Sequence, residues 1–180
     1  AGDVWKYPDP TGYDLKNELA KFYNTSDQNI IVGEGIDALL GYLVRLFIQA
    51  GDKVVTSNGS YPTFNYHVEG FGGQIFQCDY RDDKEDLQLL IDKAIKTNAK
   101  LLYFSNPNNP MGTWMRGDKI VYLLEKLPDD CLLILDEAYA EFAPNEAKVP
   151  ILVDDPRLIR FRTFSKAYGI AGARIGYGLG

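Results

Sequence analysis

The segment RTFSKAYGIAGARIGYGLG, residues 162–180, places a lysine directly after a Thr-x-Ser pair and an arginine eight positions later. Lys166 carries an amine that can attack an aldehyde, and nearby positive charge assists that attack. Arg174 offers a planar fork suited to a phosphate dianion, and Thr163 and Ser165 add hydroxyl groups. The small residues nearby would let the backbone approach a bound group closely. Because a single lysine beside a glycine-rich loop is usually just solvated, the other motifs must decide.

A second candidate is Asp136, which ends the apolar run LLILD and is followed three residues later by Tyr139. An aspartate at this place can organise magnesium in a P-loop ATPase. That class needs a G-x-x-x-x-G-K-[ST] loop, and no segment of the sequence matches it. The aspartate can also face a protonated heterocyclic nitrogen, or it can simply cap a helix. The pattern leaves these last two interpretations open.

Two further segments are rich in turn-forming residues. In SNPNNPMGT the Asn-Pro steps disfavour a helix and would hold Asn109 in an irregular backbone, from which its amide can face a cleft. In VGEGIDALL, Gly35 precedes a helix that begins with Ile36 and Asp37, so the free N–H groups there could bind an anion. Either segment alone is most often an ordinary turn or helix start.

The hydrophobic pattern predicts strands that alternate with helices in a single domain over residues 1–180. Such alternation favours a mostly parallel sheet flanked by helices on both faces, a three-layer α/β/α fold. In such sheets ligands bind beyond the carboxyl ends of the strands, and the segments NGSY, SNPNNPMG, LDEAY and TFSK each follow a predicted strand. Strands are expected over residues 29–32, 53–56, 73–78, 101–105, 131–135, 158–161 and 175–179, and helices over 14–23, 36–49, 66–71, 87–97 and 119–126.

The composition is that of a globular protein, with 46% hydrophobic and 24% charged residues. A net charge of −6 argues against a general nucleic-acid or anionic-membrane surface. Arg45 interrupts the longest apolar stretch, so no membrane span is expected. Cys78 and Cys131 lie in predicted strands and are expected to be buried thiols of a reducing compartment such as the cytoplasm. His67 is the single histidine and has no cysteine company, so no metal site is expected.

Together these residues meet the needs of pyridoxal 5′-phosphate (PLP), which are an amine for the aldehyde, a carboxylate for the pyridine nitrogen and an anion site for the phosphate. The segments YPDP, GEGIDALL, SNPNNPMG, LDEAYAEF and RTFSKAYGIAGARIGY resemble, in wording and order, the fold-type I PLP-dependent aminotransferases of classes I and II. Among these enzymes the chain is most similar to the histidinol-phosphate aminotransferases. It departs from their usual pattern at Ala38, where an acidic residue is common, and at Met111, where threonine is common.

The resemblance implies roles for individual residues. Lys166 would bind the aldehyde of the cofactor and later move a proton at the substrate α-carbon, and Asp136 would pair with the pyridine nitrogen. Tyr139 and Asn109 would hydrogen-bond the ring hydroxyl oxygen, and Tyr61 would stack on the ring. The remaining implied contacts are Gly35, Ile36 and Asp37 at the helix start, Thr163, Ser165 and Arg174 around the phosphate, and Tyr7, which the family donates from the other subunit of a homodimer.

The resemblance further implies transamination of histidinol phosphate with 2-oxoglutarate as amino acceptor, in histidine biosynthesis, with small amino-acid and 2-oxo-acid substrates. An aromatic aminotransferase or a threonine-phosphate decarboxylase would share the same cofactor residues, and a non-catalytic truncated scaffold would keep the fold. Both ends of the sequence look cut, and the N-terminal arm and C-terminal small domain of the family are absent. We therefore expect a fragment that holds the large cofactor-binding domain and lacks the family's arginine for the substrate carboxylate.

Overall fold

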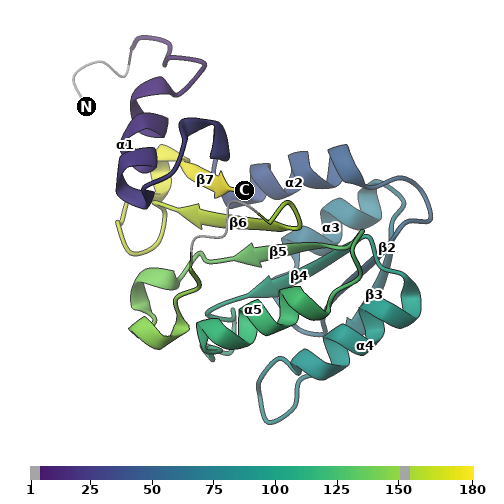
Figure 1. Cartoon of the computed structure of the whole chain (residues 1–180). Helices are drawn as coiled ribbons and strands as arrows, with labels where there is room; N and C mark the ends of the chain where they lie inside the picture. Colours follow the sequence, from purple (N-terminus) through teal and green to yellow (C-terminus); the bar gives the residue numbers. More distant parts are fainter. Residues whose placement is uncertain (1–4, 151–154) are drawn as a thin grey trace.

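A twisted sheet forms the centre of the computed structural model, which describes residues 5–150 and 155–180 (Figure 1). The strand order within these residues is β1-β7-β6-β5-β4-β2-β3. The strands are β1 (Ile30–Gly33), β2 (Lys53–Ser57), β3 (Gln74–Cys78), β4 (Leu101–Ser105), β5 (Leu132–Asp136), β6 (Leu158–Thr163) and β7 (Gly176–Leu179).

Pairing in the sheet is mostly parallel, as predicted. The neighbours from β3 through β2, β4 and β5 to β6 all pair in parallel, whereas β7 is antiparallel to both β6 and β1. The register places Ser105 beside Asp136 and Asp136 beside Phe161. The carboxyl ends of β4, β5 and β6 therefore lie together at one edge of the sheet.

Helices cover both faces of the sheet and complete the predicted three-layer α/β/α fold (Figure 1). One hydrophobic cluster joins α2 and α3 to one face, and a second joins α4 and α5 to the other. The α-helices are α1 (Tyr13–Tyr23), α2 (Ile36–Phe47), α3 (Thr63–Gly70), α4 (Leu87–Thr97) and α5 (Gly117–Lys126), and short 3-10 turns occupy Asp27–Asn29, Ala140–Phe142, Asn145–Ala147 and Ala171–Ala173.

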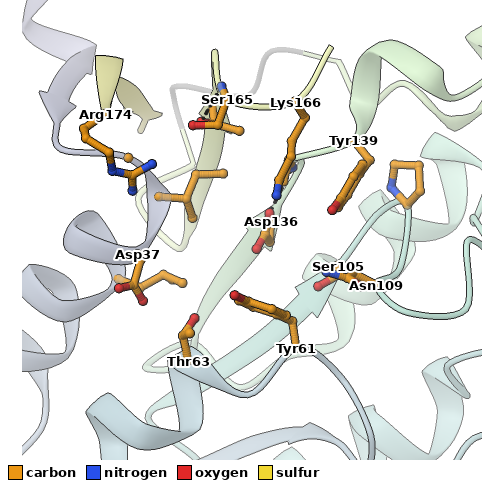
Figure 2. Close-up of a pocket in the computed structure, with 16 residues that line it drawn as sticks. Asp37, Tyr61, Thr63, Ser105, Asn109, Asp136, Tyr139, Ser165, Lys166 and Arg174 are labelled. Carbon is orange, nitrogen blue, oxygen red and sulfur yellow. Dashed lines mark hydrogen bonds between the residues drawn. The ribbon is translucent and has the colours of Figure 1, made fainter. Parts of the chain in front are cut away.

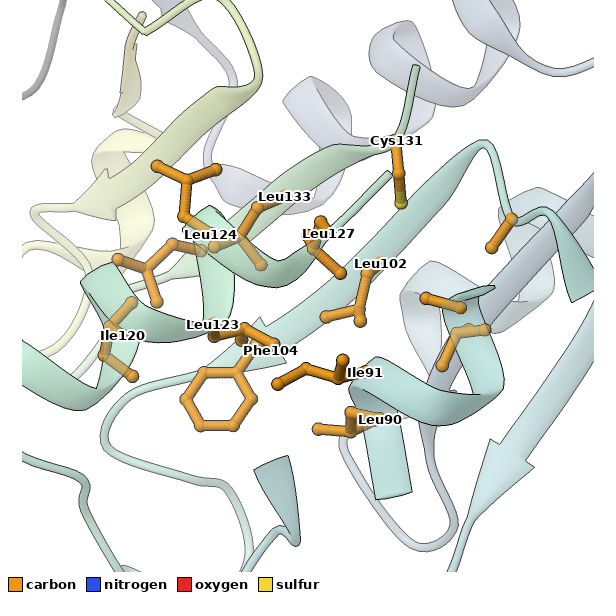
Figure 3. Close-up of a cluster of buried hydrophobic side chains, with 14 of the residues drawn as sticks. Leu90, Ile91, Leu102, Phe104, Ile120, Leu123, Leu124, Leu127, Cys131 and Leu133 are labelled. Atoms are coloured by element: carbon orange, nitrogen blue, oxygen red, sulfur yellow. The ribbon is translucent and has the colours of Figure 1, made fainter. Parts of the chain in front are cut away.

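Side-chain alternation along the central strands divides the core between the two faces. Leu102, Phe104 and Leu133 are buried against α4 and α5, as Figure 3 shows. Tyr103 and Ile134, their neighbours in sequence, belong instead to the cluster beneath α2 and α3. Because residues two apart share a face, Ser105 and Asp136 continue the α2 side of the sheet, so a site at these strand ends must lie against α2.

Most predicted elements lie within two residues of those observed, but α3 begins earlier than expected. It starts at Thr63 rather than at residue 66, because Pro62 already has helical backbone angles and its ring predisposes the chain to helix there. Helix α2 ends at Phe47, two residues early, since Ile48 is extended and buried.

The predicted burial of both cysteines is confirmed, because Cys78 and Cys131 are free and buried. Desolvation raises the pKa of the Cys131 thiol to about 12, so this sulfur stays protonated and unreactive near neutrality. Among the described residues, no helix is long and apolar enough to cross a membrane.

Leu133 provides a test of the second cluster, since its side chain is fully buried between β5 and the α4–α5 layer. Leu133→Ala should lower the free energy of unfolding by about 2–5 kcal/mol, because it removes buried apolar surface and leaves a cavity. Urea unfolding followed by circular dichroism measures the change. Leu46→Ala is the control, since Leu46 is 80% exposed and its loss should change stability by less than about 0.5 kcal/mol. Equal effects of the two substitutions would contradict the assignment of the core.

Candidate active site

A pocket opens at the carboxyl ends of β4, β5 and β6, beside the start of α2 (Figure 2). Every cofactor-binding residue predicted from the sequence lines it, except Tyr7. Tyr7 is fully exposed and lies outside the pocket. The lining residues are Gly35, Ile36, Asp37, Leu40, Tyr61, Thr63, Ser105, Pro107, Asn109, Asp136, Ala138, Tyr139, Thr163, Ser165, Lys166 and Arg174.

Asp136 lies at the base of the pocket as the last residue of β5. Its Oδ1 accepts a hydrogen bond from the Ala138 N–H at 2.9 Å, and its Oδ2 accepts one from the Tyr103 hydroxyl at 2.6 Å. Burial raises the pKa of the Asp136 carboxyl, and these two donors oppose that shift because they stabilise the charged form. Asp136 is thus a half-buried acid held in place by donors from two elements.

Lys166 reaches the pocket from the turn between β6 and β7, and its amine points toward Asp136 and Tyr139 (Figure 2). The Lys166 Nζ lies 5.5 Å from the centre of the Tyr139 ring. Thr163 shapes this turn through its hydroxyl group. The hydroxyl accepts a hydrogen bond from the Ser165 N–H at 3.1 Å and donates one to the Ile175 carbonyl at 3.2 Å. The single hydroxyl proton of Thr163 is therefore used within the protein in this arrangement.

Arg174 and the start of α2 form the opposite end of the pocket from Tyr139 and Asn109 (Figure 2). The Arg174 guanidinium donates to the carbonyls of Glu34 and Ala171, both at 3.2 Å. It also lies so close to Gly35 that a β-carbon there would be 2.7 Å from its Nη2. A side chain at position 35 would displace the guanidinium, so glycine is needed where the cation meets the first N–H groups of the helix.

The Asn-Pro segment divides its asparagines between structure and pocket. Asn106 is buried, and its amide exchanges hydrogen bonds with the backbone of Met115 and also donates to the Ala147 carbonyl. Asn108 is buried too, and its amide nitrogen donates to the Tyr80 hydroxyl at 3.1 Å. Asn109, which the sequence singled out, lines the pocket. The first two asparagines hold the backbone that presents the third.

Several residues of the site were missed at the sequence level. Thr63 and Ser105 line the pocket, and Ser105 could have been found because it ends a strand whose carboxyl end was expected to face a ligand. Tyr103, two residues before Ser105 in the same strand, also carries a hydroxyl group and was not singled out. His67, for which no metal role was expected, contacts Asp37 through Nε2 at 3.1 Å. Within the described ranges, no group of three or more metal-ligating side chains gathers.

Glu85 is a buried acid behind the pocket, and no sequence motif pointed to it. Its Oε1 accepts a hydrogen bond from the Ser57 hydroxyl at 2.7 Å, and the Asn108 side chain and Ser105 backbone also hydrogen-bond to it. Burial nevertheless raises the pKa of this carboxyl to about 7. Glu85 thus joins the ends of β2 and β4 to the Asn-Pro segment and titrates near neutrality.

Comparison with known proteins identifies the family of the chain. The family model described as aminotransferase class I and II matches residues 1–180. The chain belongs to the class I and II aminotransferase family. It is 34% identical to a histidinol-phosphate aminotransferase of Desulfotalea psychrophila over 99% of this chain and 48% of that protein. It is 36% identical to histidinol-phosphate aminotransferase 1 of Mesorhizobium japonicum over 96% of this chain and 48% of that protein.

Solved structures of other proteins share the fold. The crystal structure of histidinol-phosphate aminotransferase from Sinorhizobium meliloti in complex with pyridoxal-5′-phosphate is 56% identical, with a TM-score of 0.96 over 99% of this chain and 49% of that one. The L-threonine-O-3-phosphate decarboxylase from Porphyromonas gingivalis is 27% identical, with a TM-score of 0.83 over 98% of this chain and 51% of that one. The chain thus spans about half the length of the relatives that it matches.

The pKa of Glu85 leads to a prediction about stability and pH. The folded protein keeps this proton up to about pH 7, whereas the unfolded chain releases it near the ordinary value of 4.5. The contribution of protonated Glu85 to the free energy of unfolding is therefore fully present below pH 4.5 and is lost as the pH rises to about 7. Glu85→Gln has no proton to lose, so its stability relative to the unsubstituted protein should improve by roughly 3 kcal/mol across this window.

Urea unfolding at a series of pH values measures this difference. Glu125→Gln is the matched control, because Glu125 is exposed on α5 and its substitution should leave the pH dependence unchanged. If the unfolding free energies of the Glu85→Gln protein and its parent run parallel from pH 4.5 to 7, the assignment of Glu85 is wrong.

Proposed function

We propose that this aminotransferase-family chain is the large cofactor-binding domain of a PLP-dependent histidinol-phosphate aminotransferase, which uses 2-oxoglutarate as amino acceptor. The observation that carries the proposal is the meeting of the Lys166 amine, the Asp136 carboxylate and the Arg174 guanidinium in one pocket. The names and sequence identities of the relatives support the choice of substrate.

The residues present fit PLP group by group. An aldehyde needs an amine, and Lys166 supplies one that projects into the pocket. A pyridine nitrogen needs a carboxylate held in place, and Asp136 is fixed at the base of the pocket. A phosphate dianion needs donors and positive charge, and Arg174 with the first N–H groups of α2 provides both at the end where Gly35 leaves room.

When bound, PLP supplies an electron sink for the carbanion at the substrate α-carbon. Lys166 would hold the cofactor through its amine, and the same amine would move the proton at the substrate α-carbon. Asp136 would hold the proton on the pyridine nitrogen, because its negative charge would pair with that cation. Tyr61 would cover the ring face, while Tyr139 and Asn109 would donate to the ring hydroxyl oxygen and so orient the ring.

The phosphate end depends on three kinds of donor. Arg174 provides charge, Ser165 provides a hydroxyl, and Ile36 and Asp37 provide backbone N–H groups at the helix start. Thr163 contributes by fixing the turn between β6 and β7 rather than by donating its own proton. The Asp37 carboxylate would repel a phosphate, and in the structure this side chain contacts the His67 Nε2 at 3.1 Å.

The complete enzyme is proposed to be a cytoplasmic homodimer. The two buried free thiols suit a reducing compartment. Tyr7 is fully exposed on the described surface, so its hydroxyl is available to a second subunit. We place the group that binds the substrate carboxylate beyond this chain, because the relatives are about twice as long.

Lys166 allows a direct test of cofactor attachment. The protein mixed with PLP and reduced with borohydride should carry one label, and peptide mass spectrometry should place it on Lys166. Lys166→Ala should lose the label, and in the full-length protein it should lower the rate of histidinol-phosphate transamination by roughly 10²–10⁴-fold or more. Lys126→Ala, at the end of α5, is the control and should keep both. A label on another lysine would refute the assignment.

Tyr7 allows a test of the shared site by complementation. In full-length protein, Tyr7→Ala and Lys166→Ala should each be poorly active as homodimers. A mixed dimer regains one intact site, with Tyr7 from one subunit and Lys166 from the other, so equal mixing after subunit exchange should restore about a quarter of the original activity. No recovery, despite exchange shown by native mass spectrometry, would place Tyr7 outside the site of the partner.

A further inference from the structure

Tyr103 is a buried tyrosine directly behind the pocket that the roles assigned above do not use. It lies in β4, is 1% exposed, and its hydroxyl donates to the Asp136 Oδ2 at 2.6 Å. It does not line the pocket itself, whereas Asp136 does. It can therefore act on the chemistry only through pocket residues that it contacts, and Asp136 is the one that accepts its proton.

Two contacts fix the direction of this hydroxyl. The Tyr103 ring stacks on Phe64 of α3, with ring centres 4.7 Å apart and planes 13° apart. Ser105, two residues along the same strand, donates its hydroxyl to the Tyr103 Oη at 3.2 Å. Because Ser105 supplies the donor in that contact, the Tyr103 proton is directed to Asp136.

The Asp136 carboxylate is thereby held on both oxygens, with Tyr103 on Oδ2 and the Ala138 N–H on Oδ1. Each carboxylate oxygen has a second lone-pair direction, which stays open for a donor in the pocket. The two clamping donors come from β4 and from the turn after β5, so they prevent rotation of the carboxylate about its bond.

Tyr103 also affects the charge of Asp136. Burial favours the neutral acid, and the hydrogen bond from Tyr103 is the largest influence in the opposite direction. Burial raises the pKa of Tyr103 itself well above its ordinary value, so it remains a neutral donor at working pH. The other titratable groups that act on Asp136 are Glu137, which directly follows it after β5, Lys166 from the β6–β7 turn and Glu85 behind the pocket.

We propose that Tyr103 is a positioning residue, whose hydroxyl holds the Asp136 carboxylate charged and aimed into the pocket. The inference rests on the proposed function only in giving Asp136 the pyridine nitrogen as its partner. The contact between Tyr103 and Asp136 is a property of the protein without cofactor, so it can be tested separately.

The test is a pH titration of Asp136 by infrared difference spectroscopy on the cofactor-free protein. The carboxyl band that disappears in Asp136→Asn identifies the group. Tyr103→Phe keeps the ring and its stacking but removes the donor, and it should raise the pKa of Asp136 by about one to two units. An unchanged pKa overturns the proposal.

Phe64→Leu is the matched control, because it removes the ring stacking and leaves the Tyr103 hydroxyl in place. It should leave the pKa of Asp136 nearly unchanged, and a shift as large as that of Tyr103→Phe would show a general packing effect and overturn the proposal. Ser105→Ala gives a second measurement if Tyr103→Phe fails to fold. It weakens the Tyr103 hydroxyl as a donor and should produce a smaller rise, whereas no rise overturns the proposal.

The borohydride labelling of Lys166 separates this inference from the proposed function. If PLP does not attach to Lys166 in the unsubstituted protein, the proposed function fails while the infrared titration still decides the role of Tyr103. If PLP attaches and the titration shows no shift, the role of Tyr103 fails alone.

Discussion

Parallel pairing of β4, β5 and β6 brings three strand ends to one edge of the sheet, and the register there places Ser105 beside Asp136. Ligands bind beyond the carboxyl ends of parallel strands, so the last residue of each strand can be polar and face a cavity. The residues earlier in the same strands can remain apolar. Lys166 and Asn109 then need only short turns to reach the same cavity. The pocket is thus a consequence of strand direction and register, and its residues are far apart in sequence.

The two carboxylates at the end of β5, Asp136 and Glu137, both need hydrogen-bond donors because they lie at the end of a buried strand. Asp136 and Glu137 are adjacent and therefore point to opposite faces. Asp136 is held by Tyr103 and faces the pocket, whereas Glu137 accepts hydrogen bonds from Arg160 at 2.8 Å and 2.9 Å and from Arg162 at 3.1 Å. Loss of one partner would leave an uncompensated buried charge, which is strongly destabilising. The Asp-Glu step thus separates an acid that faces the pocket from one that is paired with arginines.

At the end of the pocket formed by Arg174 and the start of α2, the backbone segments pack unusually close together. Gly35 has a positive φ of 89° and lies against Arg174, and Gly176 lies so near α2 that a β-carbon there would be 2.8 Å from the Ile36 nitrogen. Both glycines let β7 and the turn before it press against the helix start. This packing places a guanidinium beside free helical N–H groups, which is a favourable environment for a dianion.

Much of this arrangement could be predicted from the sequence, because hydrophobic period and turn residues are local properties. The alternation of strands and helices, the parallel sheet and the candidate residues at the strand ends all followed from patterns within about ten residues. The start of α3 was placed too late, because the helical angles at Pro62 were not anticipated.

What the sequence by itself determined was the inventory of reactive groups and the strand ends that carry them. Only the tertiary structure decided which pocket hydroxyl groups can donate a hydrogen bond to a ligand. Thr163 and Ser165 look equivalent in sequence, yet the Thr163 proton goes to the Ile175 carbonyl. It also decided the hydrogen-bond partners of the acids at the strand ends, since Tyr103 reaches Asp136 and Ser57 reaches Glu85 only across neighbouring segments of the fold. Hydrogen bonds and desolvation depend on which atoms lie within a few ångströms, and that is set by packing between segments distant in the chain.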